Sequence, residues 1–144
     1  MQIAQTVLAA ALVALATTVT FAADKPIINK PAKALDWQIT QEGVAFAALS
    51  GDRFKEAYMA MVRLPAGLVS PPHTKSANMF GVVVSGTLVH HVHGETDPLE
   101  TPLQAGSFYK IPAHLPHVSK CVSDTDCVTF LYQDGSFDFL PVDQ

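Results

Sequence analysis

Five of the six histidines in this 144-residue sequence lie in two short clusters, and the sixth follows a Pro-Pro pair. The clusters have the patterns HHxH (residues 90–93) and HxxH (residues 114–117), and the separate residue is His73. Histidine is the most common metal ligand in proteins and the usual acid or base near neutral pH. We therefore expect the histidines to mark the functional site.

Strand alternation selects one histidine of the first cluster. Leu88 and Val92 are apolar and are expected to face the interior, and His90 shares their face because side chains alternate with a period of two. His91 and His93 then point to solvent. Two alternatives stay open: a bulge at the pair 90–91 that brings His93 inward, and a core histidine at position 90 bonded to a backbone carbonyl.

Short apolar segments separated by Gly, Pro and Ser turns follow one another after residue 37. The segments expected to be strands are 44–49, 58–64, 79–85, 87–93, 107–111 and 128–132. No stretch after the N-terminal leader has a sustained helical period with caps at both ends. The pattern predicts an all-β sandwich or barrel. The aromatic residues expected to pack in it, with one or two lining a pocket, are Phe108, Tyr109, Phe130, Tyr132, Phe137 and Phe139.

The spacing of glycines and histidines resembles the two motifs of the cupin family. Gly67, His73 and Gly86 fit the frame of the first motif, and Gly106 and His117 fit that of the second. The resemblance is strongest to small single-domain cupins similar to the cupin-like domain of zinc-dependent anti-sigma factors. It implies an all-β double-stranded β-helix, also called a jelly-roll barrel, and a homodimer.

The first motif departs from the metal-binding pattern of that family. Metal-binding cupins usually take two histidines and a glutamate from the first motif, but Lys75 stands at the second histidine position and Met79 at the glutamate position. An ammonium repels a divalent cation, and a thioether is a soft ligand. The remaining candidate ligand set is His73, His117 and His90, for a divalent zinc, iron or manganese ion, or for no metal at all.

Alternation also places Lys75 on the inward face with His73. A buried ammonium needs a partner or loses its proton. The partner is either an anionic ligand, such as a carboxylate or phosphate, or an Asp or Glu at the barrel mouth. The expected ligand pocket consists of His73, Lys75, Met79, His90 and His117.

Three functions follow from these residues. The first is binding of a small molecule, anionic or neutral, in a histidine-lined barrel pocket, with or without a metal. The alternatives are a metal-dependent dioxygenase or isomerase that uses His73 and His117, and an inactive interaction module. The net charge of −4 argues against a nucleic-acid binder and against a polybasic membrane-surface protein.

The N-terminus predicts export to the periplasm or the medium. Residues 1–23 carry no charge, and their apolar run at 7–16 is too short to span a bilayer. We expect a cleaved signal peptide, with an uncleaved anchor as the alternative. Cys121 and Cys127 fit a disulfide in such a compartment. The expected domains are the signal peptide (1–23), an extended segment with the first strands (24–48) and the barrel (49–144).

Overall fold

The computed structural model describes residues 26–96 and 100–142, and the expected signal peptide lies outside these ranges. Within them the chain forms one short 3-10 helix and ten strands. None of the helices in the described ranges has the length and apolar character that a membrane crossing requires. In chain order the elements are η1 (Ala32–Ala34), β1 (Trp37–Ile39), β2 (Ala45–Ser50), β3 (Tyr58–Leu64), β4 (His73–Thr74), β5 (Met79–Ser85), β6 (Leu88–Val92), β7 (Phe108–Ile111), β8 (His117–Cys121), β9 (Cys127–Gln133) and β10 (Leu140–Pro141).

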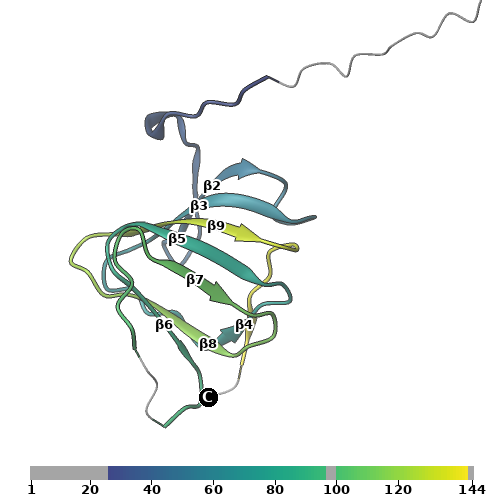
Figure 1. Cartoon of the computed structure of the whole chain (residues 1–144). Coiled ribbons are helices and arrows are strands. Elements are labelled where there is room, and N and C mark those ends of the chain that lie inside the picture. The colour runs from purple at the N-terminus through teal and green to yellow at the C-terminus, as the bar shows by residue number, and fades with distance from the viewer. Residues whose placement is uncertain (1–25, 97–99, 143–144) are drawn as a thin grey trace, which may run out of the picture.

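Two antiparallel sheets face each other and enclose the interior. The larger has the order β1-β2-β3-β9-β5-β7 and the smaller the order β10-β4-β8-β6. Figure 1 shows β6, β8 and β4 below the larger sheet, with the chain crossing repeatedly between the two. This arrangement confirms the predicted all-β jelly-roll barrel.

The longer strands lie close to where the sequence predicts them. β3 and β5 coincide with the predicted segments, and β2 is shifted by one residue. The expected domain boundary between residues 48 and 49 falls inside β2, which pairs with β3 in the larger sheet. The first two strands are therefore part of the barrel wall.

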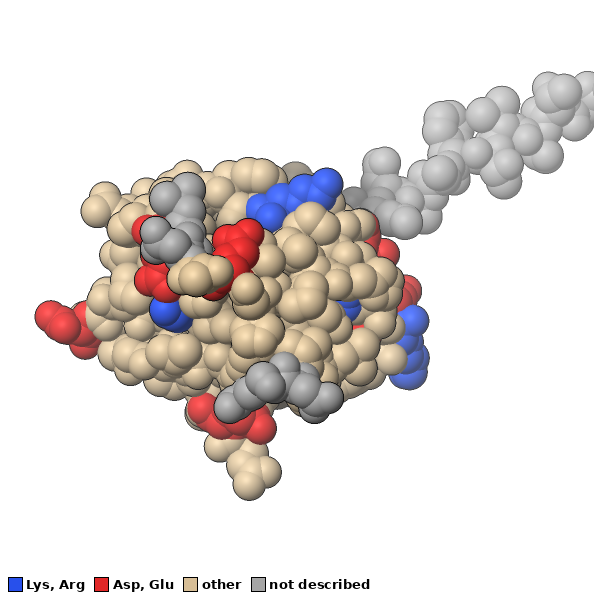
Figure 2. All heavy atoms as spheres, turned by 90° about the horizontal axis from the view of Figure 1, so that it is seen from below, with Lys and Arg blue, Asp and Glu red and all other residues tan. Residues whose placement is uncertain are grey.

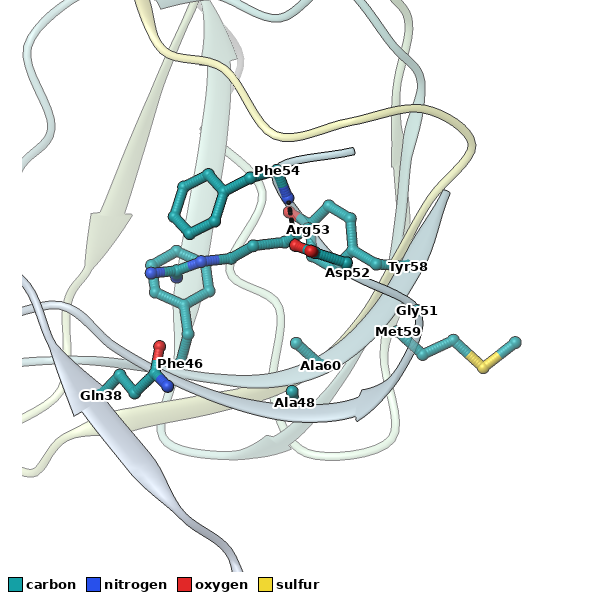
Figure 3. A pocket seen from close by; sticks show the side chains of 10 residues that line it. All are labelled: Gln38, Phe46, Ala48, Gly51, Asp52, Arg53, Phe54, Tyr58, Met59 and Ala60. Atoms are coloured by element: carbon teal, nitrogen blue, oxygen red, sulfur yellow. Dashed lines mark hydrogen bonds between the residues drawn. The ribbon is translucent and has the colours of Figure 1, made fainter. Parts of the chain in front are cut away.

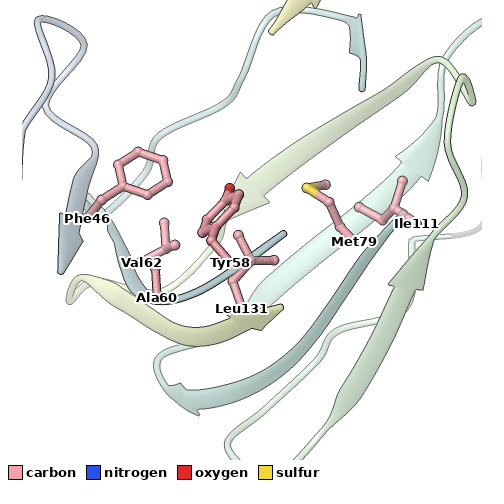
Figure 4. Close-up of a cluster of buried hydrophobic side chains, with 7 residues drawn as sticks. All are labelled: Phe46, Tyr58, Ala60, Val62, Met79, Ile111 and Leu131. Carbon is pink, nitrogen blue, oxygen red and sulfur yellow. The ribbon is translucent and has the colours of Figure 1, made fainter. Parts of the chain in front are cut away.

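The core of the larger sheet follows from alternation along its strands. In β3 the side chains of Tyr58, Ala60 and Val62 are buried, and Leu131 of β9 is buried beside them. Figure 4 shows these side chains on the inner side of the strands. The whole cluster consists of Phe46, Tyr58, Ala60, Val62, Met79, Ile111 and Leu131. Removing such apolar area from water is the main stabilising contribution to a fold of this kind.

A second buried cluster surrounds the disulfide. Cys121 and Cys127 are bonded, as predicted, and they join the facing ends of β8 and β9. Val83 and Leu88 pack against the bridge. Gly86 turns the chain between β5 and β6 with φ of 76°, and a Cβ atom there would lie 2.8 Å from the Cys127 sulfur. Only glycine fits this turn without strain.

Figure 2 shows one face of the molecule on which acidic and basic side chains lie singly or in small groups among uncharged residues.

Candidate functional site

The two motif histidines meet inside the barrel. His73 of β4 lies directly opposite His117 of β8 in the antiparallel register. Their ring centroids are 4.2 Å apart, and the two residues are 4% and 2% exposed. Segments 44 residues apart in sequence thus deliver two imidazoles to one place, because β4 and β8 are neighbours in the smaller sheet.

Backbone carbonyls fix which nitrogen of each ring carries the proton. His73 Nδ1 lies 2.9 Å from the oxygen of Pro71, and His117 Nδ1 lies 2.9 Å from that of Leu115. Because a carbonyl can only accept, Nδ1 donates and Nε2 keeps its lone pair. His117 Nε2 is buried without a partner among the described residues. Each ring therefore has a nitrogen free to accept a hydrogen bond.

His90 approaches the same region from β6. It lies opposite Ser119, whose hydroxyl is 2.9 Å from His90 Nδ1, and its ring centroid is 4.4 Å from that of Tyr109. Val92, not His90, occupies the position opposite His117. His90 is consequently displaced by two residues along the strand from the histidine pair.

The other residues of the first histidine cluster lie on the opposite face of β6, but His91 differs from the prediction. Its side chain is only 13% exposed and lies 3.2 Å from the Glu100 carboxylate, which together with Lys120 covers it. His93 is half-buried. His91 is therefore covered by a neighbouring charged pair instead of pointing to open solvent as predicted.

Lys75 is buried, with 5% of its surface exposed. Its ammonium donates a hydrogen bond to the backbone oxygen of Asp138 and lies 3.9 Å and 5.3 Å from the ring centroids of Phe137 and Phe139. The Asp138 carboxylate instead accepts from the Ser76 amide at 3.0 Å and 3.2 Å. Among the described residues no ion pair includes Lys75.

Burial sets the charges of these groups. It lowers the pKa of His73 to about 4 and that of His90 to about 4, with smaller contributions from the neighbouring histidines. It also lowers the pKa of His117. Burial lowers the pKa of Lys75 to about 8, against a weaker upward influence of Asp138. At neutral pH the site thus holds neutral imidazoles and one largely protonated ammonium.

A cavity of about 660 Å³ opens between the sheets at this point. Of the five residues predicted to line a ligand pocket, His73, Lys75, Met79 and His90 contribute to its wall. His117 lies against the His73 ring rather than at the wall itself. The apolar remainder of the wall includes Phe46, Val62, Leu64, Leu88, Leu131 and Phe137.

Two of the aromatic residues that the sequence expects to pack in the barrel, with one or two lining a pocket, lie in the cavity wall. Phe139 stacks on His73 with 4.1 Å between ring centroids and an interplanar angle of 17°, and Phe137 faces Lys75. Both follow the last long strand, in a segment without a strand pattern. Their period-two spacing was the available signal that the two rings share a face.

The tentative ligand set of His73, His117 and His90 does not fit a divalent metal centre. A catalytic zinc site usually needs three protein ligands around one point. Nowhere in residues 26–96 and 100–142 do three His, Cys, Asp or Glu side chains come together as such a group. His90 lies two residues along β6 from Val92, which occupies the position opposite His117.

Solved structures of the same fold span several kinds of protein. The KdgF structure from Halomonas sp. is 21% identical with a TM-score of 0.58, covering 73% of this chain and 93% of that one. A capsular polysaccharide assembling protein, CapF from Staphylococcus aureus, is 20% identical with a TM-score of 0.59 over 75% of this chain. Oxalate oxidase is 21% identical with a TM-score of 0.57 over 72% of this chain. The matched region is 57% of oxalate oxidase and only 32% of CapF, and at these identities the likeness concerns the fold.

The comparison with curated protein sequences found no match. The family comparison, in contrast, matches the cupin domain over residues 60–132, which runs from β3 to the end of β9 and includes both motif histidines. The two motifs, the antiparallel barrel and this match agree, and the chain belongs to the cupin domain family.

Proposed function

We propose that this protein binds a small, largely apolar molecule with an anionic group, and that the anion lies against Lys75 in the barrel cavity. The observation that carries the proposal is the state of the Lys75 ammonium. It has three donors, yet the described residues give it one backbone acceptor, two aromatic faces and no carboxylate. A buried cation with unmet donors favours an anionic ligand.

The cavity suits a ligand of this kind. Its volume of about 660 Å³ lies in the range usual for small-molecule sites, and its wall is mostly apolar. His73 and His90 add neutral imidazoles beside the ammonium, so the pocket offers one positive charge only. A single charge favours a monoanion such as a carboxylate on an apolar body.

Binding of octanoate and of 1-octanol tests the proposal, because the two share an apolar chain and differ in charge. We expect octanoate to bind at least about tenfold more tightly by calorimetry, as charge-assisted hydrogen bonds contribute about 1.5–3 kcal/mol. The difference should vanish in Lys75→Met. Lys110→Met is the matched control, because Lys110 also lies over a ring, that of Phe80, but is exposed. Equal affinity for the two compounds in the wild type would contradict the proposal.

Metal analysis of protein purified without an affinity tag addresses the alternative, a metal-dependent dioxygenase or isomerase. The side chains of His73, His90, His117 and Lys75 support a site that binds its ligand without a metal. Near-stoichiometric zinc, iron or manganese, lost in His73→Ala, would favour the metal-dependent enzyme instead. If neither metal nor octanoate binds, the interaction module becomes the better hypothesis.

We also propose that the protein is exported, to the periplasm or the medium. The disulfide between Cys121 and Cys127 and the uncharged leader support this proposal. The mass of the protein recovered from the exported fraction tests it, since we expect loss of the first 22 or 23 residues. Recovery of the full-length chain only in the cytoplasm would contradict it.

A further inference from the structure

Arg53 lies in a second cavity, of about 340 Å³, formed by β1, β2, β3 and the loop that joins β2 to β3. The guanidinium carbon lies 4.4 Å from the ring centroid of Phe46 and 4.6 Å from that of Phe54. The Phe137 ring is 5.6 Å away. Figure 3 shows the guanidinium held between the rings of Phe46 and Phe54, at the end of the cavity where Gln38 lies.

The clamped guanidinium has no anionic partner in the described part of the chain. Its Nη1 atom is buried without a hydrogen-bond partner, and none of the ion pairs there includes it. The acidic neighbours are engaged elsewhere: Asp52 pairs with Lys55 at 2.8 Å, and Glu56 accepts from the Asp52 amide at 3.1 Å. A buried donor on a charged group that stays unpaired is costly.

Arg63 provides an internal comparison. It too lies over an aromatic ring, 4.9 Å from the centroid of Trp37, but its Nε is 3.9 Å from the Asp126 carboxylate. The fold thus contains two arginines packed on aromatic rings, and only one of them has a carboxylate of the described chain beside it.

We propose that Arg53 and the cavity around it form a second binding site, for a small monocarboxylate with an apolar body. Arginine presents a planar fork of donors that matches a carboxylate, and the flanking rings hold this fork in place before a ligand arrives. Phe54 and Met59, which are 64% and 41% exposed, give the cavity an apolar rim. The loop 51–57 carries two basic and two acidic residues, so its charges cancel and a dianion such as phosphate gains no general attraction.

This site is distinct from the one in the barrel. Phe46 and Tyr58 line both cavities and form a shared wall between them, whereas Lys75 and the histidines belong to the barrel cavity alone. Loss of one site therefore need not remove the other.

Titration of the full chain with benzoate, followed by ¹H–¹⁵N NMR, tests the inference. We expect the Arg53 Nε–H signal and the amides of loop 51–57 to shift, and Arg53→Lys, which keeps the charge but loses the fork, to weaken this response at least about tenfold. Arg63→Lys and Lys75→Met should leave it unchanged. Phosphate should produce no comparable shift.

Three results would overturn the inference. They are an unchanged benzoate response in a folded Arg53→Lys, a response abolished by Lys75→Met but not by Arg53→Lys, and equal binding of phosphate. Should Arg53→Lys fail to fold, Phe54→Ala serves instead, because this exposed ring can be removed without opening the core, and the same weakening is expected.

Discussion

Burial keeps the barrel imidazoles neutral, and this links the stability of the fold to pH. His73 and His90 have pKa values of about 4 in the folded chain, whereas an unfolded histidine titrates near about 6.5. Between these values the unfolded state binds more protons than the folded state. The free energy of unfolding therefore rises with pH in this window. The stability that the neutral histidines contribute is lost as the pH falls from about 6.5 toward 4.

Urea unfolding between pH 5 and 7 measures this linkage. We expect His90→Gln to reduce the slope of the free energy of unfolding against pH by nearly one proton, about 1.4 kcal/mol per pH unit at full effect. Gln104→Ala, at an exposed side chain that does not titrate, is the control and should leave the slope unchanged. A wild-type stability that is flat from pH 5 to 7 would show that the rings are accessible to protons in the folded state.

At the residue scale, the sequence predicts the positions of residues that belong to a motif. It does not predict contacts between residues that are distant in sequence and belong to no motif. The meeting of His73 and His117 followed from the motif resemblance, because the strands that carry the two histidines, β4 and β8, are neighbours. The unpaired state of Lys75 did not follow, since Asp138 comes within reach only when the C-terminal segment folds back over β4. Whether Lys75 forms an ion pair with an acidic residue or stays without one depends on where this C-terminal segment lies.

At the scale of elements, strand length explains in part which strands the sequence could predict. β3 and β5 each have seven residues, long enough to show alternation and bounding turns. β4 and β10 have two residues each, and neither alternation nor propensity is visible over so short a run. These two strands were therefore missed, although one of them carries His73. The five-residue strand β8 was also absent from the predicted segments, so length is not the whole reason.

Gly81 leaves room for an aromatic ring that lines the barrel cavity. Gly81 of β5 lies opposite Tyr109 of β7, and a Cβ atom at position 81 would lie 2.2 Å from the tyrosine ring. That ring contacts His90, and its hydroxyl is 3.1 Å from Thr129. We expect Gly81→Ala to lower the free energy of unfolding by about 1–3 kcal/mol, because the partly buried ring must move.

Ligand binding distinguishes this displacement of the Tyr109 ring from the backbone effect of replacing a glycine. Gly81→Ala should also weaken octanoate binding, since Tyr109 lines the barrel cavity. Gly106→Ala is the control: its φ of 89° is unfavourable for alanine, but no atom lies within 4 Å of the added carbon, so stability should fall and octanoate binding should not. Unchanged binding in Gly81→Ala would mean that the ring does not shape the cavity.

At the scale of the whole molecule, the disulfide stabilises the end of the barrel that lacks the histidines. Cys121 and Cys127 are both buried, and they close a short loop between β8 and β9. We expect the double change Cys121→Ala and Cys127→Ala to lower the free energy of unfolding by about 2 kcal/mol, mainly by freeing the unfolded chain. Urea unfolding measures this difference, and adding reductant should lower the wild type similarly but leave the double variant unaffected.

The outer face of the larger sheet is the surface on which we propose that two copies form a homodimer. Met61, Phe130, Val82 and Phe108 lie in one register row across β3, β9, β5 and β7. Val82 is 38% exposed and Phe108 62%. A contiguous apolar row on an exterior face is a feature of interaction sites, and family resemblance favours a second copy as the partner.

Sedimentation equilibrium of the wild type should give twice the mass of one chain, and Val82→Lys should give a single mass, because a charge in the middle of the row must lose its water on association. Val122→Lys is the matched control, since Val122 is 51% exposed but lies beyond β8, away from this row. Both variants should melt within a few degrees of each other, so that a change of mass reflects the interface and not the fold. A wild type that stays monomeric at high micromolar concentration would contradict the homodimer. Equal dissociation by the two variants would show that the dimer does not form through this row.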